Sequence, residues 1–195
     1  MFLTYANQLT ILRLIFVPCF VVLLVYGHVA AAMLLFVLAG VTDGLDGLIA
    51  RRLGQRTALG SYLDPMADKL LLTAAFVTLS VPSVPLAVHI PVWLTILTIS
   101  RDLLIALSAL IIHLKTGHSE FPPSMLGKWT TASQLVTVGL AMLANFSARL
   151  IADAFLAGVY VTLVLVLASG LHYAYRSAQL IDAYQRGHAS GPTGN

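Results

Sequence analysis

Four aspartates within one short window of the sequence are its clearest candidates for chemistry. Asp43 and Asp46 are three residues apart, and Asp64 and Asp68 are four residues apart. Either spacing places both carboxylates on one face of a helix. Carboxylates that meet at one depth repel each other unless cations hold them, and Mg²⁺ and Mn²⁺ prefer such oxygen ligands. We therefore predict a site for Mg²⁺ or Mn²⁺, with one ion or two.

A purely structural explanation of the same aspartates is also open. The carboxylates could pair with neighbouring cations and hold two helices together, using Arg51, Arg52 and Lys69. Paired spacing on two successive helices is more order than such ion pairs require, so the metal site is the preferred interpretation.

The composition indicates that lipid surrounds the elements that carry these aspartates. The chain has 195 residues, of which 58% are hydrophobic and 10% charged, whereas a soluble domain averages about 25% charged residues. A crossing helix needs about 20 residues, so about six helices fit. We predict an all-α fold, a polytopic bundle of six transmembrane helices within residues 1–186, and a short disordered tail at 187–195. The predicted helices are residues 7–27, 29–52, 59–81, 91–114, 127–146 and 151–175.

The basic residues predict how this bundle is oriented. Residues 29–41 and 70–81 are apolar but too short to span alone, so the aspartates lie near one membrane surface. Basic residues gather on that side, and only Arg149 lies on the other. They are Arg51, Arg52, Arg56, Lys115, Lys128, Arg176 and Arg186. The positive-inside rule then places the aspartates and both termini in the cytoplasm, in a bacterial inner membrane.

Several classes of function do not fit the sequence. No continuous basic face for nucleic acid is visible. Cys19 is the only cysteine, so neither a disulfide nor a thiolate metal site can form within the chain. A cleaved signal peptide is not expected, because the only early basic residue, Arg13, directly abuts the first apolar stretch.

The aspartate window resembles the signature of the CDP-alcohol phosphatidyltransferase family. Every specified position of the family pattern is filled in this chain. The pattern reads Asp43-x-x-Asp46-Gly47-x-x-Ala50-Arg51, eight residues, then Gly60-x-x-x-Asp64-x-x-x-Asp68. Eight specified positions at fixed spacing make a chance match very improbable. The length of the chain and the six predicted crossings extend the resemblance over most of the sequence.

The resemblance implies a reaction and a role for each motif residue. Members of this family transfer a phosphatidyl group from CDP-diacylglycerol to an alcohol and release CMP. Asp43, Asp46 and Asp64 would bind two metal ions, and Asp68 would bind metal or act as the general base. Gly47, Ala50, Arg51 and Gly60 would line the cytidine diphosphate site. The resemblance also implies a homodimer.

The acceptor alcohol has to be inferred from residues outside the motif. Arg101 lies about ten residues into a predicted crossing, where a cation must face the bundle interior or a wet cavity. It could join Arg56 and Lys128 around an acceptor phosphate, or simply pair with Asp102 or a motif aspartate. The stretches at 63–69 and 127–131 resemble the phosphatidylglycerophosphate synthase and cardiolipin synthase branches. We expect glycerol 3-phosphate as acceptor, then phosphatidylglycerol, then another alcohol such as inositol phosphate or serine.

Two other classes of membrane protein use acidic residues on helices. An intramembrane prenyltransferase holds a diphosphate through aspartates and Mg²⁺, but its motifs are spaced differently and it has more crossings. A divalent-metal transporter needs acids along its whole path, whereas these gather at one surface. Metal-dependent phosphatidyl transfer is therefore the predicted function.

Overall fold

The structure of the chain is a computed structural model that is helical throughout its described regular regions. It describes the backbone of residues 5–53, 58–116, 124–146 and 148–189, and the side chains of residues 12–42, 67–111, 114, 124–146, 151–177 and 179. The helices are α1 Tyr5–Val25, α2 Val29–Leu53, α3 Ala58–Ser80, α4 Val92–Thr116, α5 Met125–Ala144 and α6 Ala148–Ala189. The predicted all-α fold is confirmed for these residues.

The sixth helix differs most from its predicted range. The hydrophobic run ends near residue 175, but α6 continues to Ala189. A helix does not have to stop where its apolar residues stop, so hydropathy alone places this boundary too early. Residues 187–189 of the predicted tail are helical, and residues 190–195 lie outside the described part.

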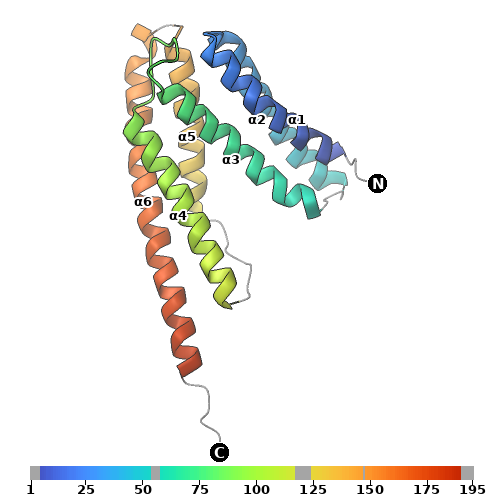
Figure 1. Cartoon of the computed structure of the whole chain (residues 1–195), viewed down its shortest axis with the longest axis vertical. Helices are drawn as coiled ribbons and strands as arrows, with labels where there is room; N and C mark the ends of the chain where they lie inside the picture. The colour runs from blue at the N-terminus through green and yellow to red at the C-terminus, as the bar shows by residue number, and fades with distance from the viewer. Residues whose placement is uncertain (1–4, 54–57, 117–123, 147, 190–195) are drawn as a thin grey trace, which may run out of the picture.

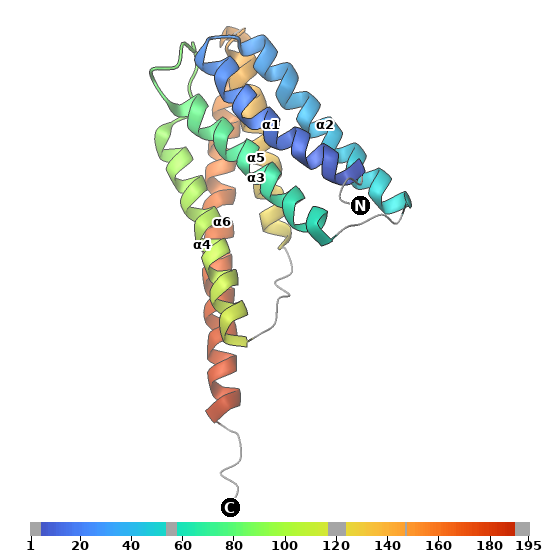
Figure 2. The same ribbon diagram turned by 45° about the vertical axis from the view of Figure 1, so that its right-hand side comes forward.

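The six helices form two groups of three (Figure 1). α1 packs against α2 and α3, and α6 packs against α4 and α5. The groups touch where α3 meets α4 and α5, and where α2 meets α5. Figures 1 and 2 show the groups separating toward the end where α1 begins and α6 ends. The motif-bearing ends of α2 and α3 point the same way.

The apolar core lies toward the opposite end, where α1 turns into α2. Its largest fully buried members include Phe20 of α1, Phe76 and Leu79 of α3, and Met142 of α5. These large side chains from three helices pack closely against one another, which favours association of helices in lipid as well as in water. The two helical groups are therefore joined firmly at this end.

The turn between α1 and α2 depends on a glycine. Gly27 has φ +77°, a left-handed conformation that disfavours side chains with a Cβ. The amide of His28 donates to the carbonyl of Leu23 at 2.8 Å, and that of Gly27 to Leu24 at 2.9 Å. These two bonds form a Schellman motif, which ends α1 and sends the chain directly into α2.

A single asparagine fixes the other connections at this end. The Oδ1 atom of Asn145 accepts from the amides of Ala87 and Val88, at 2.7 and 3.2 Å. Its Nδ2 donates to the carbonyls of Val88 and Ala141, at 3.1 and 2.8 Å. Asn145 thus ties the α3–α4 loop to the end of α5.

Two of the helices contain stretches long and apolar enough to cross a membrane, judged over the described residues. These are Val92–Ile111 and Ile151–Ser177, and only 22% of each is buried. Shorter apolar stretches are Leu12–Val25 and Val29–Thr42. Six crossings are not established by these stretches alone.

Candidate active site

The structure places the four motif aspartates on two helices of the same group. Asp43 and Asp46 lie on α2, and Asp64 and Asp68 lie on α3. Because both segments are helical, the three- and four-residue spacings put each pair on one helix face. Of these four side chains the structure describes only that of Asp68.

The other predicted nucleotide-site residues can be placed only by their backbone. Gly47, Ala50 and Arg51 lie near the end of α2, and Gly60 lies in the first turn of α3. Their side-chain surroundings and the whole of Arg56 lie outside the described residues. The assignments of these five residues therefore stay predictions.

Asp68 forms an ion pair with a buried arginine of α1. Nη1 of Arg13 donates to Oδ1 of Asp68 at 2.7 Å. The Arg13 side chain is only 3% exposed, whereas that of Asp68 is 44% exposed. A charge-assisted bond of this length fixes the carboxylate while leaving much of it open to solvent or ligand.

A second chain of charges begins at the next residue of α3. Nζ of Lys69 lies 2.6 Å from Oδ2 of Asp102 on α4. The other oxygen of Asp102 accepts from Nη1 of Arg101 at 2.7 Å. Two cations therefore share one carboxylate, and this three-residue group carries a net positive charge.

The local pair between Arg101 and Asp102 was one of the two alternatives for this arginine, and the structure contains it. It does not exclude an anion site, because Lys69 takes part in the same group. The bridge also brings Arg101 next to the motif helix. The predicted acceptor residue and the last motif aspartate are thus linked through adjacent residues of α3.

Side chains of α6 hold the guanidinium of Arg101 from its other side. Its Nε donates to Oγ of Ser169 at 3.2 Å, and its Nη2 donates to the same oxygen. The ring of Tyr173 lies against it, with its centroid 5.8 Å from Cζ. All three residues are buried.

The start of α5 completes this cluster. Ser124 caps the helix, since its Oγ accepts from the amide of Gly127 at 3.1 Å. The amide of Ser124 in turn donates to the phenolic oxygen of Tyr173 at 3.0 Å. A Cβ on Gly127 would lie 3.4 Å from each of three atoms, Arg101 Nη2, Ser124 Oγ and Tyr173 Oη.

The side chain of Lys128 does not contact the group around Arg101. Its side chain is exposed, and no ion pair of it is found among the described side chains. It follows Gly127 directly, so it lies one residue from the group around Arg101.

Sequence reasoning placed Arg13 either at the edge of the nucleotide or lipid pocket or at the membrane interface as an anchor, and it assigned no role to Ser169 or Tyr173. The signal for Arg13 was a cation within an apolar helix, which requires a partner. Ser169 and Tyr173 are four residues apart on one face of α6, but serine and tyrosine are common in such helices. Their role becomes visible only once α4 and α6 lie side by side.

Comparison with known proteins agrees with the motif. The family model for CDP-alcohol phosphatidyltransferase matches residues 3–170. A Mycobacterium tuberculosis (strain ATCC 25618 / H37Rv) protein named "Probable phosphatidylglycerophosphate synthase" is 39% identical over 144 residues, covering 71% of this chain but only 65% of that relative.

Two further relatives represent both predicted branches. The Bacillus subtilis (strain 168) "CDP-diacylglycerol--glycerol-3-phosphate 3-phosphatidyltransferase" is 31% identical over 86% of this chain and 91% of its own length. The Homo sapiens "Cardiolipin synthase (CMP-forming)" is 33% identical over 72% of this chain and 50% of its own. With the family model matching most of its length, the chain belongs to the CDP-alcohol phosphatidyltransferase family.

Proposed function

We propose that this protein transfers a phosphatidyl group from CDP-diacylglycerol to glycerol 3-phosphate and releases CMP. The filled aspartate motif on α2 and α3 carries the proposal. It is supported by family membership and by relatives whose names give this reaction.

The motif residues suit a divalent metal site. Four carboxylates on two helices that both pack against α1 offer oxygen ligands, the donor set that Mg²⁺ and Mn²⁺ prefer. Asp43, Asp46 and Asp64 would hold two ions, with Asp68 as a further ligand or as the base. Bound there, the metal would neutralise the pyrophosphate and assist departure of CMP.

The reaction needs a base for the acceptor hydroxyl. Asp68 would accept the hydroxyl proton as the hydroxyl oxygen forms its bond to the phosphatidyl phosphorus. The bond from that phosphorus to CMP breaks, and CMP leaves with the bridging oxygen. The ion pair with Arg13 keeps the carboxylate of Asp68 oriented from α1. Gly47, Ala50, Arg51 and Gly60 would line the nucleotide site.

The group around Arg101 is the proposed site for the acceptor phosphate. Arg101 is buried, carries net positive charge together with Lys69 and Asp102, and is bridged to α3 next to Asp68. Phosphate prefers a planar arginine that can offer paired N–H groups. Lys128 and Arg56 would add charge at its edge. The same site would fit phosphatidylglycerol, because that acceptor also carries a phosphate. Cardiolipin synthesis, in which phosphatidylglycerol is the acceptor, is therefore the second candidate, and the human relative is named for this reaction.

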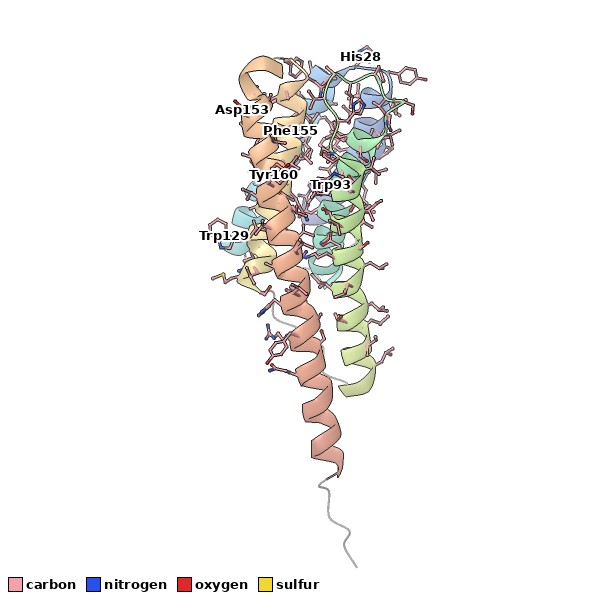
Figure 3. The ribbon with its side chains drawn as sticks, turned by 90° about the vertical axis from the view of Figure 1, so that its left-hand side faces the viewer. His28, Trp93, Trp129, Asp153, Phe155 and Tyr160 are labelled. Carbon is pink, nitrogen blue, oxygen red and sulfur yellow. The ribbon has the colours of Figure 1, made fainter. Side chains whose placement is uncertain are left out.

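We further propose that all six helices cross the bacterial inner membrane. The outer surface is rich in large apolar side chains that lipid would cover. Those of α4 and α6 include Leu103, Leu107, Leu114, Val164 and Leu171, all more than half exposed. Trp129 of α5 (Figure 3) is 65% exposed, and tryptophan is enriched at the membrane interface. The basic residues near the motif would face the cytoplasm, and two copies would form a homodimer.

An acceptor panel tests the proposal. Protein purified in mild detergent with Mg²⁺ or Mn²⁺ receives CDP-diacylglycerol and one acceptor: glycerol 3-phosphate, phosphatidylglycerol, inositol phosphate or serine. We expect CMP and phosphatidylglycerophosphate with glycerol 3-phosphate. Product from phosphatidylglycerol alone would assign the cardiolipin reaction instead, and absence of CMP with every acceptor would refute the proposed activity.

Two substitutions test the metal site. Asp43→Asn and Asp64→Asn should abolish turnover, because a neutral amide is a poor ligand for a hard cation. Asp153→Asn is the matched control, because this exposed aspartate of α6 lies far from the motif. It is at the same end of the molecule as His28, which lies between α1 and α2 (Figure 3). Full activity in both motif variants would refute the metal site and favour a structural role for the aspartates.

A further inference from the structure

The guanidinium of Arg101 is held in one orientation by contacts from α6. A single oxygen, Oγ of Ser169, accepts from both Nε and Nη2, which fixes one edge of the guanidinium. The ring of Tyr173 lies 5.8 Å from Cζ and limits tilting. Asp102 holds Nη1 at 2.7 Å. An arginine side chain has several rotatable bonds, so such contacts remove freedom that a ligand would otherwise have to remove.

These contacts do not use all the N–H groups of Arg101. Arg101 has five N–H groups, and the contacts to Ser169 and Asp102 use one on each nitrogen. Within the described part of the chain, each Nη nitrogen therefore keeps a second N–H that can bind an oxygen atom. A buried cation with unused donors gains most from an acceptor that carries negative charge.

The start of α5 lies beside these donors. The first turn of a helix carries partial positive charge, which is unfavourable next to a guanidinium unless an anion joins them. Gly127 lacks the Cβ that would lie 3.4 Å from Nη2 of Arg101 and from Oη of Tyr173. Tyr173 also accepts from the amide of Ser124, so one phenol connects α6 to the start of α5.

We propose that Ser169 and Tyr173 are positioning residues for recognition of the acceptor phosphate. They do not touch the acceptor. Ser169 fixes the edge of the Arg101 guanidinium, and Tyr173 sets its tilt and its distance from the start of α5. The inference rests on the proposed function, because it assigns Arg101 to an acceptor that bears a phosphate. It goes further by naming the residues that make this arginine selective.

The test separates phosphate recognition from general damage. Ser169→Ala should raise the KM for glycerol 3-phosphate about tenfold, equivalent to about 1.4 kcal/mol. The kcat and the KM for CDP-diacylglycerol should stay within about twofold of the wild-type values. The rate with glycerol, an acceptor without phosphate, should not change, so discrimination between the two acceptors falls. Tyr173→Leu should act in the same direction, and Tyr173→Phe, which keeps the ring, should have a smaller effect.

Thr162→Val provides the matched control. Thr162 is a buried hydroxyl two turns away on α6 and bonds to Thr137 at 2.9 Å. Its loss should cost stability without changing the KM for glycerol 3-phosphate. An equal rise in this KM for Thr162→Val, or an equal loss with glycerol and glycerol 3-phosphate in Ser169→Ala, would overturn the proposal. So would a wild-type KM in Ser169→Ala.

Binding measured without turnover separates this inference from the proposed reaction. Glycerol 3-phosphate should raise the melting temperature of wild-type protein, because a ligand that binds only the folded state stabilises it. The shift should be lost in Ser169→Ala and kept in Thr162→Val, whether or not CMP is released. If only phosphatidylglycerol serves as substrate, its KM replaces that of glycerol 3-phosphate in the same comparison. A shift of wild-type size in Ser169→Ala, or none in wild type with either phosphate-bearing acceptor, refutes the positioning role.

Discussion

The ion pair between Arg13 and Asp68 joins α1 to the last residue of the motif, and its strength can be measured. Arg13→Met removes the charge and keeps an apolar chain of similar length. Asp68→Ala removes the carboxylate. A double-mutant cycle with both changes isolates their coupling even though each residue has other contacts.

The two exposures set the expected energies. Exposed pairs contribute about 0–1 kcal/mol, and removing one partner of a buried pair costs about 3–5 kcal/mol. Arg13 is 3% exposed and Asp68 is 44% exposed, so the pair lies between these limits. We expect a coupling energy of about 1–3 kcal/mol. Asp68→Ala should destabilise more than Arg13→Met, because it takes a carboxylate from the deeply buried guanidinium, whereas the half-exposed carboxylate of Asp68 can be hydrated when Arg13 is replaced.

Chemical denaturation in mild detergent, followed by helical circular dichroism, gives the free energies of unfolding for the four proteins. CMP release measured on the same samples reports the effect on turnover. Coupling below about 0.5 kcal/mol would show that the pair does not fix Asp68. A larger loss from Arg13→Met than from Asp68→Ala would refute the argument from exposure.

Three further substitutions test other parts of the molecule. Arg101→Lys keeps the charge but loses the planar guanidinium with its paired N–H groups. The KM for glycerol 3-phosphate should rise about tenfold to a hundredfold, because a charge-assisted hydrogen bond contributes about 1.5–3 kcal/mol. Lys69→Arg, which keeps the charge at an exposed position, should change this KM little. Asn145→Ala removes three hydrogen bonds to the α3–α4 loop and one to Ala141 of α5, and should lower the free energy of unfolding by about 2–4 kcal/mol without changing the KM for the acceptor. A loss below about 0.5 kcal/mol would contradict this. Gly27→Ala forces a Cβ into φ +77° and should cost about 1–2 kcal/mol in the same denaturation measurement, and an unchanged stability would show that the turn relaxes.

The regular structure could be predicted from the sequence because its signals are local. Apolar runs and breaks by proline or glycine gave six helices near their observed places. Hydropathy failed for the end of α6, since a helix can continue to Ala189 after its continuous apolar run has ended. The Asn145 contacts could not be predicted either, because they join segments 57 and 58 residues apart.

The candidate site divides in the same way. The motif aspartates are found by spacing within a helix, and the sequence offered the pair of Arg101 with Asp102 as one of two alternatives. Arg13 required a partner, but no local pattern identifies Asp68, which is 55 residues away. The partnership of Arg101 with Ser169 spans 68 residues. Such pairs depend on how whole helices pack, and a single sequence does not display that packing.

The position of α3 follows from two bridges at adjacent residues. Successive side chains of a helix point about 100° apart, so Asp68 and Lys69 face different neighbours. Asp68 meets Arg13 of α1, and Lys69 meets Asp102 of α4. The first bridge lies within one group of helices, and the second crosses to the other group. A shift of α3 along its axis would strain both bridges, so the spacing between the motif and Arg101 is constrained by charge where the helical groups separate. This gives a physical reason for a lysine directly after the last motif aspartate: it links the proposed phosphatidyl-transfer site to the proposed acceptor site.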